Sequence, residues 1–144
     1  MALTMTKAER QQFLAATHIA VVSVAAPGRG PLSVPVWYSY TPGGEVRFVT
    51  GGNSRKAAMI RRSGRASLCV QTETPPYQYV SIEGPAVIDT PDFERDMRAM
   101  AIRYLGEQMG EWYLQSTAAE RATAVLVRLR PERWLSVDYG KMNQ

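Results

Sequence analysis

A short stretch near the middle of the chain brings together glycines, a hydroxyl group and two cations. The stretch reads Thr50-Gly51-Gly52-Asn53-Ser54-Arg55-Lys56. Ser54 is a favoured helix N-cap residue, so Arg55 and Lys56 fall in the first turn of a predicted helix. That position costs each cation about 0.3–1 kcal/mol, because a helix N-terminus is itself partly positive. The glycine amides, the Ser54 hydroxyl, the helix start and the cations therefore predict a cradle that binds phosphate.

The alternative interpretation is that Arg55 and Lys56 are solvated and pair with acidic residues elsewhere. Three further arginines follow closely: Arg61, Arg62 and Arg65. They either extend the anion-binding surface or form a solvated helix face, and the sequence leaves both interpretations open. The glycine pair favours the phosphate cradle.

Other reactive side chains are scarce. Cys69 is the only cysteine and His18 the only histidine, which excludes disulfides, Cys/His zinc sites and multi-histidine metal centres. His18 precedes an apolar strand without a Ser or Asp partner in sequence, so a packing or capping role is favoured over catalysis. Cys69 lies in a β-rich run, where a buried thiol behaves as a small apolar residue. We therefore predict no catalytic side chain and no metal site.

Methionines and aromatic residues cluster in the second half of the chain, and their spacing suits a helix. They are Met97, Met100, Met109, Trp112 and Tyr113. Core or dimer contacts are the favoured interpretation, and the lining of an apolar substrate pocket is the alternative.

The bulk composition limits the class of protein. The 144 residues are 45% hydrophobic and 21% charged, which predicts one ordinary domain over residues 1–144. The net charge of +4 is modest, and its position near the cradle favours a small anionic ligand over nucleic acid. The longest apolar stretch, Ile19–Ala26, is far shorter than the roughly 20 residues of a membrane span. Without a signal-peptide core at the N-terminus, we expect a cytoplasmic protein.

The elements that position the cradle are mostly strands. A capping box at Thr6 predicts a helix over residues 6–16. Alternating apolar residues predict strands over 18–89, interrupted by a helix over 54–63, then a helical segment over 91–118 and closing strands over 123–138. The chain is thus mainly β with peripheral helices. Its six to seven antiparallel strands suit a closed or nearly closed barrel better than a sandwich, because closure removes exposed edges.

Two local predictions are more specific. Leu32–Tyr40 alternates as one strand, pairs with the strand before it and continues into Glu45–Thr50, so the chain opens as an antiparallel meander. Thr90 caps the later helix and Pro91 occupies its first position. That helix is expected to end at Gly106, with a second helical piece after it.

Five motifs occur in order along the chain: Pro31 to Tyr38, Thr50 to Lys56, Arg65-Ala66-Ser67-Leu68, Tyr77-Gln78-Tyr79-Val80 and Glu83-Gly84-Pro85-Ala86. In this order they resemble the pyridoxamine 5′-phosphate oxidase-like flavoproteins, over roughly residues 5–140. The Pro75-Pro76-Tyr77 loop and the ending Pro131 to Lys141 are most similar to the F420-dependent oxidoreductases of actinobacteria. The resemblance implies a split β-barrel.

The resemblance also implies where the cofactor binds. Ser54, Arg55 and Lys56 would hold its phosphate, with Thr50 just before the cradle. The segment Pro35-Val36-Trp37 would lie beside its tricyclic ring. A homodimer is implied, with two cofactor sites at the interface. Tyr77 and Tyr79 would be supplied by the partner subunit.

The implied activity is an oxidoreductase that uses F420, or alternatively FMN, to transfer a hydride to a small electron-poor organic substrate. The alternative is a protein that binds or sequesters the cofactor without turnover. Vitamin B6 oxidation is not expected, because the basic positions for a substrate phosphate and a C-terminal Arg-x-His-type motif are absent from the sequence.

Overall fold

The computed structural model describes residues 2–143. These residues include eight strands: β1 (Ala20–Val24), β2 (Leu32–Val36), β3 (Ser39–Tyr40), β4 (Val46–Gly51), β5 (Arg65–Gln71), β6 (Gln78–Asp89), β7 (Ala124–Leu129) and β8 (Arg133–Asp138). The helices are α1 (Lys7–Ala15), α2 (Arg55–Ser63), the π-helix η1 (Phe93–Arg98), α3 (Ala99–Ser116) and the short 3₁₀ helices η2 (Ala118–Thr123) and η3 (Tyr139–Asn143).

The strands form one curled antiparallel sheet. Seven of them follow the path β2-β1-β5-β6-β7-β4-β3, and β8 pairs with β6. β2 and β3 lie at opposite ends of this path, yet only Trp37 and Tyr38 separate them in the chain. The sheet therefore curls until its two ends meet without a hydrogen-bonded ladder between them. The predicted mainly-β split barrel with peripheral helices is confirmed.

The prediction of one continuous strand over Leu32–Tyr40 is wrong at its centre. The Tyr38 amide donates to the hydroxyl of Tyr104 on α3 (3.1 Å) instead of a neighbouring strand. The same hydroxyl donates to the His18 carbonyl (2.6 Å). Because the strand is interrupted there, its first half pairs with β1 and its second half pairs with β4. The opening is therefore two hairpins at opposite ends of the sheet path, not a meander.

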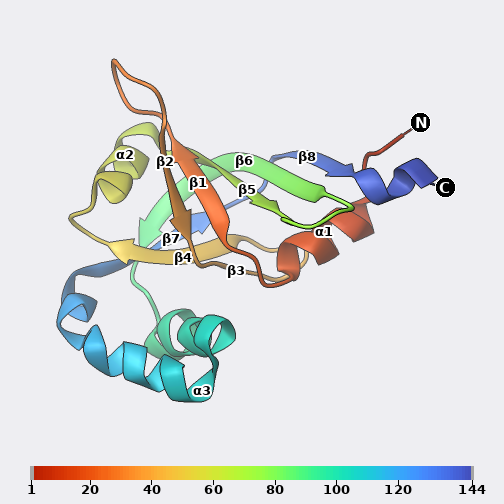
Figure 1. Cartoon of the computed structure of the whole chain (residues 1–144). Coiled ribbons are helices and arrows are strands. Elements are labelled where there is room, and N and C mark those ends of the chain that lie inside the picture. The colour runs from red at the N-terminus through yellow and green to blue at the C-terminus, as the bar shows by residue number, and fades with distance from the viewer. Residues whose placement is uncertain (1, 144) are drawn as a thin grey trace.

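α1 and α2 close the two ends of the barrel (Figure 1). Leu14 of α1 and Ile60 of α2 are both buried in one core with inward-facing strand residues such as Phe48 and Ile82. The predicted capping box is present at Thr6, whose hydroxyl accepts from the Glu9 amide at 3.1 Å. Both helices agree with their predicted ranges to within one residue at each end.

The helical crossover between β6 and β7, residues 93–123, is called the arm; it hangs below the sheet in Figure 1. The predicted cap at Thr90 is wrong: Asp92 caps the arm by accepting from the Arg95 amide at 2.8 Å. The arm turns sharply at Gly106, where φ is +83°, as the two predicted helical pieces require. None of the helices in residues 2–143 is long and apolar enough to cross a membrane.

Candidate functional site

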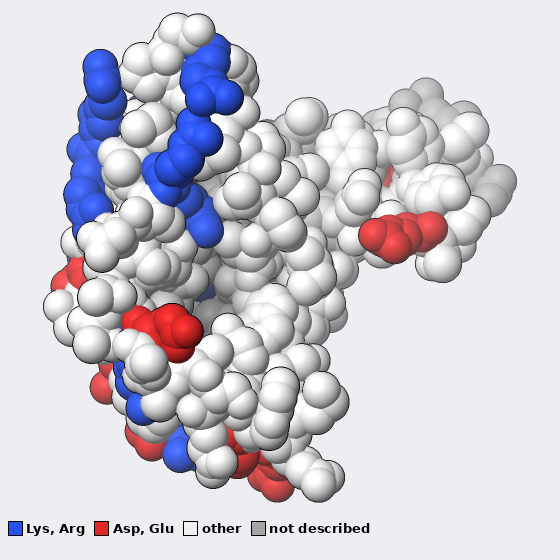
Figure 2. Space-filling model, turned by 60° about the vertical axis from the view of Figure 1, so that its left-hand side comes forward, with Lys and Arg blue, Asp and Glu red and all other residues white. Residues whose placement is uncertain are grey.

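A cavity of about 640 Å³ lies between the barrel and the arm. The barrel side consists of the end of β2, the end of β4 and the start of α2, and η1, α3 and η2 form the opposite side. Figure 2 shows a hollow on the α2 side of the molecule, with Lys and Arg side chains gathered above it. Five of the predicted site residues line the cavity: Pro35, Val36, Trp37, Thr50 and Lys56.

The start of α2 has the expected N-terminal geometry. The Ser54 hydroxyl accepts from the Ala57 amide at 3.1 Å, and its oxygen lies 3.4 Å from the Thr50 hydroxyl oxygen. Within residues 2–143, the amides of Arg55 and Lys56 have no acceptor, as expected for the first turn of a helix. These amides and the helix start are a ready binding site for an anion.

The role predicted for Gly52 needs a correction. Its amide is not free for a phosphate, because it donates to the Thr123 carbonyl at 2.8 Å. A Cβ atom on Gly52 would lie 2.5 Å from the same carbonyl oxygen. Glycine is thus required for the close approach to the start of β7. Nothing lies within 4 Å of a Cβ on Gly51, which lines the cavity.

Lys56 is half-buried in the cavity wall and Arg55 is exposed beside it. Within residues 2–143, neither side chain has a carboxylate at ion-pair distance. Burial lowers the pKa of Lys56, and no neighbouring charge opposes this shift. The alternative interpretation therefore holds for Arg55 in so far as this residue is solvated, but neither cation has the acidic partner that it predicted within residues 2–143.

Two of the three other arginines near α2 have partners in the structure. Arg61 donates to the Gly52 carbonyl at 2.8 Å and so braces the loop before α2. Arg65 pairs with Glu132 at 3.1 Å. Arg62 is exposed to solvent.

Trp37 joins the barrel to the arm. Its ring stacks almost parallel to that of Tyr104, with 5.1 Å between centroids, and lies 5.1 Å from the ring of Tyr113 at a tilt of 51°. These two tyrosines come from the two halves of α3. Trp37 also lines the cavity. Its contacts with the two tyrosines therefore hold the arm side of the cavity against the barrel.

The arm contributes an apolar wall. Met97, Met100, Tyr113 and Leu114 line the cavity, so the pocket-lining alternative fits three of the five clustered residues. Met109 and Trp112 instead lie on the outside of the arm, 54% and 62% exposed.

A buried ion pair at the base of the arm was missed in the sequence. Asp96 of η1 is fully buried and accepts two hydrogen bonds, each of 2.9 Å, from the Arg47 guanidinium of β4. It also accepts from the Asp92 amide at 2.8 Å. The only sequence signal is an acid on the apolar side of a helix. The pair fastens the arm to the barrel beside the cavity.

Four of the nine predicted site residues do not line the cavity: Ser54 and Arg55 at the start of α2, and Tyr77 and Tyr79. Tyr77 is exposed and Tyr79 lies on the outer face of β6, and neither lines the cavity of its own protomer. His18 bonds to the Phe13 carbonyl at 3.0 Å and stacks on the Phe13 ring. The prediction of a packing or capping role for His18 is confirmed.

A sequence profile of the family described as pyridoxamine 5′-phosphate oxidase matches residues 6–138. The chain belongs to this family. The family resemblance predicted from the motifs is thus confirmed, and the split barrel is the fold of the solved structures described next. No curated protein matches the chain.

Several solved structures are similar. The conserved hypothetical protein Rv2991 from Mycobacterium tuberculosis is 26% identical, with a TM-score of 0.81 over 100% of this chain and 92% of that one. A structure named F420 reductase is 17% identical, with a TM-score of 0.63 over 87% and 94%. An FAD-binding protein from Mesorhizobium loti is 20% identical, with a TM-score of 0.63 over 92% of both chains. The last two share the fold.

Proposed function

We propose that the chain binds F420, or alternatively FMN, by its phosphate at the start of α2 and works as an oxidoreductase on a small electron-poor organic molecule. The observation that carries this proposal is Lys56, a half-buried cation on a cavity wall without a carboxylate partner in residues 2–143. An anionic ligand would supply the missing charge. F420 is placed first because the motifs resemble F420-dependent oxidoreductases and an F420 reductase shares the fold.

The residues fit a phosphate-bearing tricyclic cofactor. Arg55, Lys56 and their amides would hold the phosphate, and the Thr50 and Ser54 hydroxyls would donate to it. Pro35, Val36 and Trp37 would pack against the ring. When bound, the cofactor would supply the hydride. The protein's own part is to orient the ring and to keep water out of a cavity lined by methionine and leucine side chains.

We also propose that a second copy of the chain completes the site. The outer face of β2, β1, β5, β6 and β8 carries a row of neighbours in register: Pro35, Val21, Cys69, Ser81 and Leu135. Val21 is 43% and Leu135 59% exposed. At one edge of this face, Ile19 and Pro35 also line the cavity. A partner that covers the apolar face would therefore close the cavity at the same time, and its Tyr77 and Tyr79 are proposed to contact the ring.

The single cysteine tests this interface directly. Cys69 lies in the middle of the row and is only partly exposed, so a partner would shield it from a thiol reagent. We expect labelling of Cys69 to slow as protein concentration rises and to be fast at all concentrations in Leu135→Glu. Labelling that is independent of concentration, together with a monomeric mass, would contradict the dimer.

The cofactor assignment is tested by titration. Oxidised and reduced F420, FMN and FAD are added to the purified protein, and binding is followed by fluorescence. Replacing both Arg55 and Lys56 with Ala is expected to weaken binding at least tenfold, about 1.4 kcal/mol. Arg62→Ala, on the exposed side of the same helix, is the matched control and should bind normally. Failure of all three cofactors to bind at micromolar concentration would contradict the proposal.

Binding without turnover is the second candidate. It is favoured by one observation about the two carboxylates that line the cavity in residues 2–143: Asp96 is already bonded to Arg47 and to a backbone amide, and Glu120 is exposed to solvent. Tight binding without reduction of a panel of enones, quinones, nitroaromatics and tetrapyrroles would support a sequestering role.

A further inference from the structure

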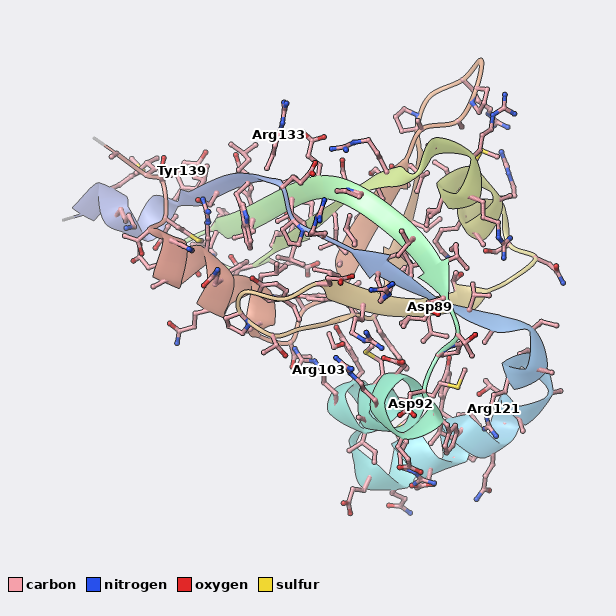
Figure 3. The ribbon with its side chains drawn as sticks, turned by 180° about the vertical axis from the view of Figure 1, so that it is seen from behind. Asp89, Asp92, Arg103, Arg121, Arg133 and Tyr139 are labelled. Carbon is pink, nitrogen blue, oxygen red and sulfur yellow. The ribbon has the colours of Figure 1, made fainter. Side chains whose placement is uncertain are left out.

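The arm places a second cation on the cavity wall. Arg121 of η2 lines the cavity and is half-buried. Its guanidinium lies 4.5 Å from the centre of the Phe93 ring, and Nη2 donates to the Leu114 carbonyl at 2.9 Å. Figure 3 shows Arg121 on the arm, near Asp92 at the start of η1.

Both contacts of this guanidinium are neutral. Within residues 2–143, no carboxylate lies at ion-pair distance from Arg121. Its neighbour Glu120 lines the cavity mouth but is exposed to solvent. Arg47 and Arg98, in contrast, are paired with acids of the arm. Arg121 therefore has no counter-ion among the described residues, and most of its five N–H donors stay available.

The two contacts also fix the guanidinium in place. Stacking on the Phe93 ring and a hydrogen bond to the Leu114 carbonyl already restrict the side chain. Less rotamer entropy is therefore lost when a ligand binds to it. The arm side of the cavity lining that includes Arg121 has apolar residues, Leu114, Met97 and Met100, beside the polar Thr117 and Glu120. An anion that contacts Arg121 is thus only partly screened by water, and such a bond is stronger than at the surface.

Lys56 and Arg121 reach the cavity from different elements. Lys56 comes from α2 at the end of the barrel, and Arg121 comes from the arm. Most of the other residues that line the cavity are aliphatic or aromatic. The cavity can therefore hold one anionic group at the barrel side and another at the arm side, with apolar ring surface between them.

We propose that Arg121 is a specificity-determining residue and that the arm side of the cavity takes a small apolar molecule bearing one anionic group, such as an aromatic carboxylate. This inference rests on the proposed function, in which the barrel side takes the cofactor phosphate at Lys56. The anionic group of the substrate binds the Arg121 guanidinium, and its apolar part packs against Met97, Met100 and Leu114.

Two fluorescent probes of the same ring class test the proposal without turnover. 1-Anilinonaphthalene-8-sulfonate carries one anionic group, and N-phenyl-1-naphthylamine is neutral. Both are titrated in phosphate buffer into the full chain. The wild type should bind the anionic probe more tightly. Arg121→Gln should weaken the anionic probe at least tenfold and the neutral probe less than twofold. Arg95→Gln, an exposed arginine of the same arm, should change neither.

Two further variants make each outcome decisive. Met97→Trp adds volume to the lining and should abolish the binding of both probes; signal that remains in this variant comes from other surfaces and is subtracted. Arg121→Lys keeps the charge and should retain part of the preference for the anionic probe. It takes the place of Arg121→Gln as the test if the arm of Arg121→Gln is unfolded.

Three outcomes would overturn the proposal. One is an unchanged preference for the anionic probe in Arg121→Gln. Another is a preference that disappears in Lys56→Gln but not in Arg121→Gln, which would place the anion at the barrel side and leave the proposed cofactor function intact. The third is absence of binding of both probes to the wild type. Failure of F420 and FMN to bind would, in contrast, count against the proposed function and leave the probe result standing.

Discussion

At the scale of single residues, Lys56 is unfavourable for the free protein and favourable for ligand binding. A cation that is partly removed from water without a partner raises the free energy of the folded state. Burial alone accounts for the lowered pKa of Lys56. An anion in the cradle would reverse this effect, so stability and binding oppose each other at this position.

Lys56→Met is expected to separate the two effects. Without ligand the variant should be more stable by about 0.5 kcal/mol, since an unpaired cation is replaced by an apolar side chain of similar length. Inorganic phosphate should raise the Tm of the wild type more than that of the variant, which keeps Arg55 and the backbone amides but lacks the Lys56 charge. The comparison is made by thermal melts, with the exposed Lys7→Met as control. A phosphate response as large in Lys56→Met as in the wild type would contradict the role of Lys56 in the cradle.

His18 should govern the pH dependence of stability between pH 5 and pH 7.5. Burial lowers its pKa below 6.5 in the fold, so the unfolded chain binds the proton more readily. Stability should therefore fall as the pH drops below about 6.5 and be unaffected by this residue above it. Urea melts should show this fall in the wild type and not in His18→Gln, whose amide can still donate to the Phe13 carbonyl.

The contribution of Glu9 falls in a lower pH range. The Lys141 ammonium, with the Thr6 amide, lowers the pKa of Glu9 to about 2. Its stabilising effect is complete above about pH 4.5 and is lost as the pH falls toward 2.

The His18 prediction has a clear contrary outcome. If the free energy of unfolding falls equally between pH 7.5 and 5 in the wild type and in His18→Gln, groups other than His18 are responsible.

At the scale of elements, the junction between β4, α2 and β7 depends on one glycine of the Gly51-Gly52 pair. Gly52→Ala should destabilise the protein by about 2 kcal/mol, because the new methyl group would collide with the Thr123 carbonyl. Gly51→Ala meets nothing within 4 Å and should change stability by less than about 0.5 kcal/mol. Chemical denaturation of both variants measures the difference. Equal losses would contradict the close packing.

The attachment of the arm to the barrel depends on the Arg47–Asp96 pair. Asp96→Asn leaves the guanidinium of Arg47 largely buried without a counter-ion, and we expect a loss of about 3 kcal/mol. The double variant Arg47→Met with Asp96→Leu should recover most of this loss, since neither charge remains buried. Urea melts of the single and double variants test this, and a double variant as unstable as Asp96→Asn would contradict it.

The strands and the cradle helix could be predicted because their signals are local. Alternation, turn residues and the Ser54 cap are all contained within a few neighbouring residues. The break at Trp37 and Tyr38 could not be predicted, because it depends on Tyr104, which lies 66 residues further along the chain. The roles of Gly52 and Asp96 could not be predicted for the same reason. They depend on Thr123 and Arg47, which are distant in sequence and which only the fold brings close.

At the scale of the whole molecule, a dimer would couple stability to concentration. If a second copy covers the apolar face that includes Val21 and Leu135, tenfold dilution should lower the Tm by about 2–4 °C. Leu135→Glu should remove this dependence, whereas Met109→Glu, on the outside of the arm, should retain it. Calorimetry over a range of protein concentrations checks this. A wild-type Tm that does not change on dilution would count against the dimer.

The position of β6 in the sheet also has a consequence for synthesis on the ribosome. One edge of β6 is paired early, with β5, but its other edge is paired by β7 and β8, which begin at Ala124 and Arg133. The segment before α1 is held by the same late strand, since the Met5 amide donates to the Ser136 hydroxyl. Until these last residues leave the exit tunnel, the nascent chain carries an open strand edge, the kind of surface that pairs with other chains. A ribosome stalled before Ala124 would therefore hold a chain that is prone to aggregation and, in the cell, dependent on chaperones that bind the nascent chain.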